Sequence, residues 1–237
     1  LVDSRDCRFQ EYRDGWGYRV DGPGPDNTFE VANWFFSGVD ALDGETTNAG
    51  AATPFPIGTY AAAIAPVGPT PLPVPQPSPP PTPQPSLLPV PLPSAPPVAA
   101  PFAQASLLVI TGVVDGPFPG GLPKAVELYA IQDVADLSLF GLESANNGGG
   151  SNGPEFTLSG SASQGDNIYV ATEIDGFEAF FGFLPDFTSS AVAVNGDDAI
   201  LLFQDGVVVD VFGDPDVDGT GEAWDYLDGW GYRVDGT

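Results

Sequence analysis

The sequence has no histidine and no methionine, and it contains one cysteine, Cys7, and one lysine, Lys124. Without histidine there can be no Ser–His–Asp triad, no Cys–His pair and no histidine-ligated zinc. A single cysteine forms no intrachain disulfide, although Cys7 could cross-link two chains. No P-loop surrounds Lys124. The carboxylates could include a glycosidase pair, but no pair stands out. We therefore predict that the protein is not an enzyme.

Positive charge is scarce as well. The sequence has five arginines and one lysine but 32 acidic residues, which gives a formal net charge of −26. Such a chain repels polyanions and anionic membrane surfaces, so we expect neither nucleic-acid nor membrane partners. No apolar run has the length of a membrane span. The scarcity of lysine and the lack of histidine, together with abundant aspartate, glycine and threonine, favour an extracellular or cell-surface protein. Because no signal peptide or initiator methionine is visible, we expect a mature product or an excised segment.

Proline is concentrated in one segment. Residues 66–101 hold 17 of the 27 prolines, and proline has no backbone N–H to give to a core. We expect a polyproline II linker there, with a fully extended reach of about 110 Å. PxxP patterns also permit an SH3 ligand, but the basic residues of such ligands are missing. The chain thus divides into residues 1–65, the linker 66–101, and residues 102–237.

Short strands separated by turn residues are predicted throughout the third segment. Asp205 and Gly206 have the residue types of a two-residue hairpin turn. Phenylalanines in 176–183 and the tryptophans are expected in the core, in preference to a sugar-stacking role. The predicted strands are 106–114, 124–131, 166–173, 198–204 and 207–213. This pattern favours an all-β sandwich or barrel. Residues 17–22 and 29–38 add two strands, which are too few to be stable alone.

The nonapeptide DGWGYRVDG occurs twice, at 14–22 and at 228–236. The first copy continues into 23–38, whereas the second is followed only by Thr237. We therefore predict that 1–65 is the C-terminal part of one domain and that 102–237 is the body of another, lacking its last strand or strands. Three arrangements stay open: a longer tandem array, closure within the chain, or strand donation to another molecule. Two copies competing for one place count against closure within the chain.

Four segments carry a family resemblance. Residues 108–130, 144–158 and 195–236 resemble bacterial lamin-tail-domain proteins, and 31–60 resembles the end of the same domain. The resemblance implies an immunoglobulin-like β-sandwich in a secreted or surface protein. In that family the domain is non-catalytic and occurs in repeat-bearing surface proteins or beside extracellular nucleases. This chain departs from the family because its C-terminal segment comes first.

The segment DPDVDGTGEAWD, 214–225, matches an EF-hand calcium loop at most ligand positions. Gly219 falls where that loop turns sharply, but Pro215 and an aspartate at position 12 depart from the motif. An acidic surface turn is the alternative. The predicted calcium ligands are Asp214, Asp216, Asp218, Thr220, Glu222 and Asp225.

Together these features predict an extracellular structural protein. It would assemble with other copies of itself into a fibre, sheath or surface layer, with residues 11–64 completing the sheet of a neighbouring 102–237 block and calcium stabilising the loop. The alternative is a binding module, either adhesin-like or an accessory domain of a secreted nuclease.

Overall fold

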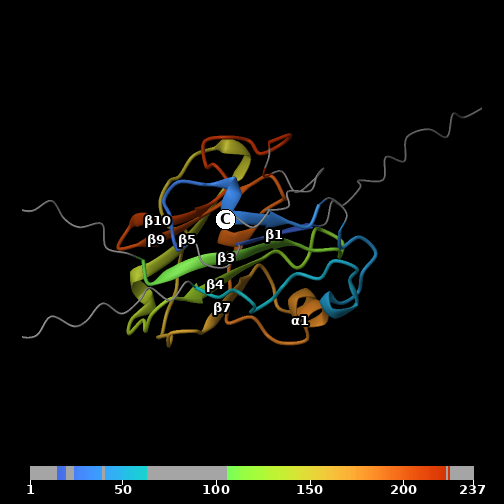
Figure 1. The fold of residues 1–237 in the computed structure, drawn as a ribbon, viewed down its shortest axis with the longest axis horizontal. Helices are drawn as coiled ribbons and strands as arrows, with labels where there is room; N and C mark the ends of the chain where they lie inside the picture. The colour runs from blue at the N-terminus through green and yellow to red at the C-terminus, as the bar shows by residue number, and fades with distance from the viewer. Residues whose placement is uncertain (1–14, 20–23, 39–40, 63–105, 223, 225–237) are drawn as a thin grey trace, which may run out of the picture. The chain divides into compact units, whose positions relative to one another are not determined.

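The computed structural model describes residues 15–19, 24–38, 41–62, 106–222 and 224 (Figure 1). Described residues from both sides of the proline-rich segment belong to one compact unit. Two β-sheets form its framework, and the described residues include a single α-helix, α1 (Asp175–Phe181).

The larger sheet has six strands in the order β2-β1-β3-β4-β7-β8. All neighbours are antiparallel except β7 and β8, which are parallel. The strands are β1 (Gly15–Arg19), β2 (Trp34–Phe36), β3 (Leu108–Asp115), β4 (Ala125–Ala130), β7 (Asn167–Ala171) and β8 (Phe187–Thr188). The first two strands in sequence are thus joined to strands that follow the proline-rich segment.

The smaller sheet has four antiparallel strands in the order β10-β9-β5-β6. They are β5 (Phe140–Ala145), β6 (Phe156–Thr157), β9 (Ala199–Gln204) and β10 (Val207–Phe212). Asp205 and Gly206 connect β9 to β10 with φ values of 52° and 77°. Positive φ at both positions is the geometry of a type I′ turn, so the predicted hairpin is confirmed.

Short 3-10 helices fill several connections between the strands. They are η1 (Val31–Asn33), η2 (Asn48–Gly50), η3 (Leu137–Leu139), η4 (Asn146–Gly148) and η5 (Ser190–Val192). No helix among the described residues is long and apolar enough to cross a membrane.

The main core lies where the two sheets face each other. Alternate residues of β3, such as Leu108 and Ile110, meet Ile200 and Leu202 of β9 and Phe212 of β10 in one buried cluster. The period of two follows from the pleat of a strand, which sends successive side chains to opposite faces. The predicted all-β class is confirmed, whereas the immunoglobulin-like arrangement stays a prediction.

A second cluster covers the outer face of the larger sheet. It joins Trp16 and Tyr18 of β1 to Val109 and Val114 of β3. The covering layer consists of Leu42, Ala51, Phe55 and Tyr60 from the N-terminal segment and Phe180 from α1. In Figure 1 the N-terminal segment runs across this face beside α1. The N-terminal segment therefore supplies both a strand and part of a second layer.

Closure within one chain, which the repeated nonapeptide disfavours in the sequence, is the arrangement that the structure describes. Strand β1 pairs with β3 of its own chain over Gly15 to Tyr18. Two strands cannot be stable alone, and pairing with β3 solves this problem without a neighbour. The second copy of the nonapeptide lies outside the described residues.

Candidate functional site: the position of strand β1

Strand β1 occupies an internal position of the larger sheet. Its residues pair with β2 through Gly17 to Arg19 and with β3 through Gly15 to Tyr18, and all five are buried. We call the surroundings of this strand the β1 slot. The slot consists of Phe36, Phe55, Gly112, Val113, Glu127, Asp210 and Phe212.

The two faces of β1 meet different surroundings. On the inner face, Gly17 lies over the Phe212 ring, and an added Cβ would be 2.7 Å from Cε2 of that ring. A real Cβ does not approach a ring so closely, so the slot selects glycine at this position. On the outer face, Trp16 lies 5.6 Å from Phe55 between ring centroids, and its Nε1 donates to the Thr53 carbonyl at 3.2 Å.

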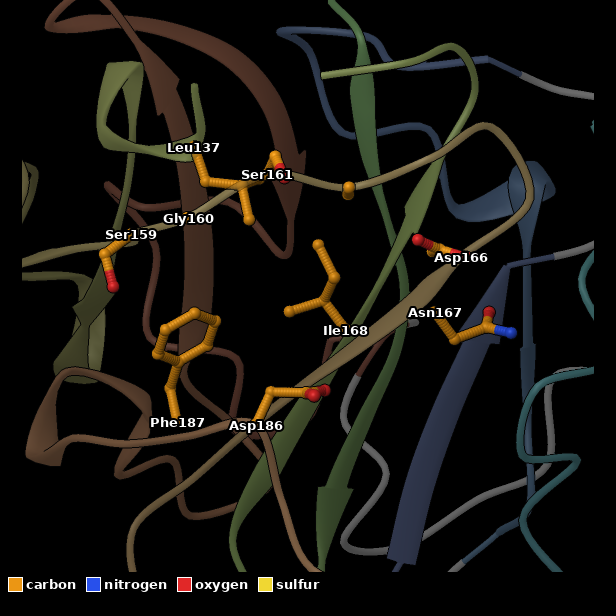
Figure 2. A pocket seen from close by; sticks show the side chains of 10 residues that line it. Leu137, Ser159, Gly160, Ser161, Asp166, Asn167, Ile168, Asp186 and Phe187 are labelled. Atoms are coloured by element: carbon orange, nitrogen blue, oxygen red, sulfur yellow. The ribbon is translucent and has the colours of Figure 1, made fainter. Parts of the chain in front are cut away.

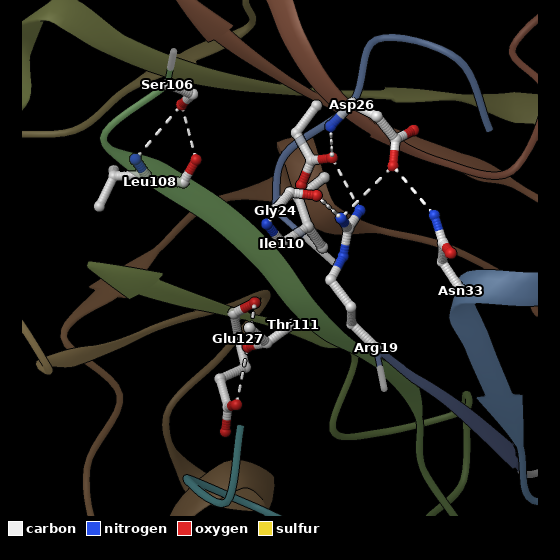
Figure 3. A network of polar contacts seen from close by, with 10 residues as sticks. Arg19, Gly24, Asp26, Asn33, Ser106, Leu108, Ile110, Thr111 and Glu127 are labelled. Carbon is white, nitrogen blue, oxygen red and sulfur yellow. Dashed lines mark hydrogen bonds and ion pairs between the residues drawn. The ribbon is translucent and has the colours of Figure 1, made fainter. Parts of the chain in front are cut away.

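Arg19 carries the buried charge of β1 (Figure 3). Its Nη2 donates to Asp210 Oδ1 at 2.7 Å, and both side chains are fully buried. Its Nη1 donates to the Gly24 carbonyl at 2.5 Å, and the guanidinium lies 4.9 Å from the centroid of the Trp34 ring. A buried arginine keeps its charge, so it needs a buried acceptor such as Asp210.

Asp210 joins three separate parts of the chain. Besides Arg19, its Oδ1 accepts from the Asp26 backbone N–H at 2.9 Å, and its Oδ2 accepts from the Ile110 N–H at 2.7 Å. The register of β3 against β4 shifts between Ile110 and Gly112, which marks a β-bulge. A bulge leaves a backbone group without a ladder partner, and Asp210 supplies one. Asp210 thereby links β10 of the smaller sheet to β1 and β3 of the larger sheet.

Glu127 holds the outer side of the slot. Its Oε1 accepts from the Tyr18 hydroxyl at 2.9 Å and from Thr111 Oγ1 at 2.8 Å, and its Oε2 accepts from the Gly58 N–H at 2.7 Å. The Tyr60 N–H in turn donates to the Tyr18 hydroxyl at 2.7 Å. Burial raises the pKa of Glu127, and the hydrogen bonds from Gly58 and Thr111 oppose that rise. One side chain of β4 therefore binds both β1 and the segment that covers it.

A second ion pair, between a partly exposed lysine and a buried aspartate, involves the single lysine of the sequence. Lys124 Nζ donates to Asp115 Oδ1 at 2.6 Å and to the Val194 carbonyl at 2.6 Å. Burial, together with repulsion from Asp198 and Asp197, outweighs the lysine and raises the pKa of Asp115 to about 7. Asp198 accepts from the Asn195 N–H at 2.9 Å, as expected for a capped turn.

Four buried carboxyls have a raised pKa chiefly because burial disfavours their charge: Asp115, Glu127, Asp198 and Asp210. For Asp115 and Asp210 the pKa rises from 3.8 to about 7. Between these values the folded protein binds protons that the unfolded chain releases, so stability increases as the pH falls. Lowering the pH from about 8 to 5.5 should raise the melting temperature by on the order of 5 °C.

Thermal unfolding followed by circular dichroism at several pH values measures this effect. Asp115→Asn should flatten part of the profile, because the amide does not titrate. A melting temperature that stays constant or falls over this pH range would contradict the prediction.

The predicted calcium loop lies on the surface between β10 and Trp224. Asp214 Oδ1 accepts from the Asp216 N–H at 3.0 Å, and Asp218 Oδ1 accepts from the Thr220 N–H at 3.1 Å. Hydrogen bonds from the backbone N–H and the side chain of Thr220 lower the pKa of Asp218. Of the predicted ligands, Asp214, Asp216, Asp218, Thr220 and Glu222 are exposed, and Asp225 lies outside the described residues. The described part of the chain has no group of three acidic or thiol ligands placed to hold a metal, and calcium stays a prediction.

A cavity of about 410 Å³ lies near one edge of both sheets (Figure 2). Leu137, Ile168 and Phe187 give it apolar walls, and Ser161 and Asp186 add polar groups. Ile168 and Phe187 are directed toward this space in Figure 2. The Asp186 carboxylate already accepts from the Tyr169 N–H at 2.8 Å.

The slot residues Asp210 and Glu127 were not predicted from the sequence as functional. Each is an acidic residue inside an otherwise apolar strand, VVVDVF and AVELYA. Such a residue implies a buried partner, because an unpaired charge is costly inside a protein. Arg19 is a possible partner for Asp210, because it is one of only six basic residues. The two residues are 191 positions apart, so no local sequence pattern reveals that they pair.

The fold and the slot define an all-β protein of two sheets in which an N-terminal strand completes the larger sheet. Comparison of the chain with protein-family models, with curated proteins and with solved structures gives no match. The resemblance to bacterial lamin-tail-domain proteins therefore stays a prediction from the sequence.

Proposed function

We propose that this protein is a non-catalytic structural protein of the extracellular space or cell surface, which assembles with copies of itself into a fibre, sheath or surface layer. The observation that carries the proposal is the β1 slot. An internal strand and part of the covering layer come from residues 15–62, which are connected to the rest of the unit through residues 63–105.

Exchange of this segment between molecules explains how copies would join. A neighbour that donates residues 11–64 makes the same hydrogen bonds with Asp210 and Glu127 as the chain makes with itself. Domain swapping of this kind needs little new interaction energy, because each contact within a chain is replaced by the same contact between chains. A long proline-rich linker favours such exchange, since it can span two bodies.

Calcium belongs to the proposal as a stabiliser of the 214–225 loop. Trp224, in this loop, packs against Phe212 with ring centroids 6.4 Å apart, and Phe212 belongs to the slot. A cation bound by Asp214, Asp216 and Asp218 would therefore stiffen the chain beside the slot and reduce repulsion within an acidic protein.

Negative-stain electron microscopy of the purified chain, with calcium and then with a chelator, tests the proposal. We expect regular filaments or sheets with calcium and fewer without it. The matched variant Asp214→Asn/Asp216→Asn/Asp218→Asn should make the assembly insensitive to calcium. Deleting residues 1–65 should leave a remainder that aggregates or does not assemble. Normal assembly of that truncated protein would refute the role of the segment.

The binding-module alternative is supported by the cavity whose lining mixes the apolar Leu137, Ile168 and Phe187 with polar residues such as Ser161 and Asp186. The same microscopy distinguishes the two functions. Compact single particles under all conditions would contradict the structural function and favour a ligand-binding module.

A further inference from the structure

We propose that the β1 slot is a binding site for a second strand of sequence GWGYR, supplied by residues 229–233 of this chain, which displaces β1 and frees it to enter the slot of a neighbouring molecule. The inference rests on the proposed function and deepens it, because it names the strand that competes for the slot.

The part of the slot that lies after the proline-rich segment recognises positions 17 to 19. Gly17 is selected by the closeness of Phe212, Tyr18 binds Glu127, and Arg19 binds Asp210. Residues 229–233 have the same five amino acids in the same order as β1. A strand that presents these residues can make the same contacts with Phe212, Glu127 and Asp210, whereas a strand without the tyrosine or the arginine leaves the buried Glu127 or Asp210 without that donor.

Trp224, the last residue that the structure describes, lies beside the slot. Trp224 is buried, and its ring packs against Phe29 and Phe212, with centroid distances of 5.8 and 6.4 Å. Phe212 is the ring beneath Gly17. Residue 229 follows Trp224 by five positions, and five extended residues span at most about 17 Å. This short tether favours binding of residues 229–233 to the slot of their own chain.

The two strands have different advantages. The N-terminal copy brings Phe55 and Tyr60, which add a covering layer, but it is tethered through the long proline-rich segment. The C-terminal copy has the shorter tether, and the cost of closing a loop rises only slowly with length. The two copies thus have comparable claims on one slot, and we expect them to compete for it. Whichever strand is displaced is available to a neighbour.

Valine substitutions at matched glycines test the competition in the full chain. Gly17→Val and Gly231→Val each block one copy, because a Cβ at this strand position meets the Phe212 ring. If either copy can fill the slot, each single variant should lose less than about 3 °C of melting temperature, and the double variant should lose about 10 °C or more. If the double variant shows no cooperative transition while both single variants still do, this outcome also supports the proposal. A Gly17→Val loss as large as that of the double variant overturns the proposal.

A synthetic peptide provides an independent measurement. Refolding the double variant with the peptide DGWGYRVDG should restore the cooperative transition, whereas DGWVYRVDG should not. Equal failure of both peptides would overturn the proposal.

Light scattering on the same proteins separates this inference from the assembly proposal. A non-additive loss in chains that stay monomeric supports strand competition and contradicts assembly. An additive loss in chains that form filaments contradicts strand competition and leaves assembly to other contacts.

Discussion

Replacing Asp210 with alanine should lower the free energy of unfolding by about 3 to 5 kcal/mol at pH 8. The substitution leaves the fully buried Arg19 without its carboxylate, and it removes the acceptor of the Asp26 and Ile110 N–H groups. Removal of one partner from a buried ion pair is costly because the other charge remains buried. We specify pH 8 because the pKa of Asp210 is about 7, so the carboxylate is then charged.

Strand exchange cannot rescue the Asp210→Ala variant. Both nonapeptides carry an arginine at the equivalent position, Arg19 and Arg233, so either strand would bury an unpaired charge in the altered slot. Urea unfolding followed by tryptophan fluorescence measures the loss. Asp43→Ala is the matched control, because Asp43 is exposed and its removal changes the net charge equally. A loss for Asp210→Ala that equals the loss for Asp43→Ala would contradict the role of the ion pair.

The local part of the fold could be predicted from the sequence. Short apolar runs separated by turn residues predicted β3, β4, β7, β9 and β10 within a few residues of their observed bounds. Asp205 and Gly206 predicted the hairpin because few residue pairs accept positive φ at both positions. The expected burial of tryptophan is confirmed for Trp16, Trp34 and Trp224, which are exposed by 2, 2 and 4%. These predictions depend on neighbours in sequence, where the chemistry of a few residues decides the conformation.

Strand β5 was not predicted, because its sequence, FGLESA, contains a glycine, a glutamate and a serine and no β-branched apolar residue. The structure explains both unusual residues. An added Cβ at Gly141 would lie 2.7 Å from Pro154 Cβ, and the buried Glu143 accepts from the Asn152 N–H at 2.6 Å. Gly141 and Glu143 are thus explained by contacts with Pro154 and Asn152, which the local sequence pattern does not reveal. A glycine or an acid in a strand therefore points to a close approach or a buried donor.

The place of β1 could not be predicted, because strand pairing across a long separation leaves no local pattern. The sequence reveals two equal candidates for one position and no reason to favour either. The structure adds the covering layer of Phe55 and Tyr60 and the bond between Gly58 and Glu127, which follow β1 in sequence. Those contacts favour the N-terminal copy in the described arrangement.

Replacing Phe212 with alanine should also lower the free energy of unfolding by about 3 to 5 kcal/mol. Phe212 is fully buried, and its ring centroid lies 4.8 Å from that of Trp34 and 5.8 Å from that of Phe29. Removing the ring takes away these contacts and leaves a cavity under Gly17. Val207→Ala is the control on the same strand, because Val207 is 66% exposed and its truncation should change stability by less than about 0.5 kcal/mol.

The cavity should also change what the slot accepts. In the native protein the Phe212 ring excludes a side chain at position 17, and the same ring would exclude one at position 231. In the Phe212→Ala background, valine at both positions should fill the cavity, so the combined loss of stability should be smaller than the sum of the separate losses. Chemical unfolding of the three proteins gives this coupling directly. Additive losses would mean that Phe212 does not set the requirement for glycine, and the selectivity of the slot would then have to come from Arg19 and Tyr18.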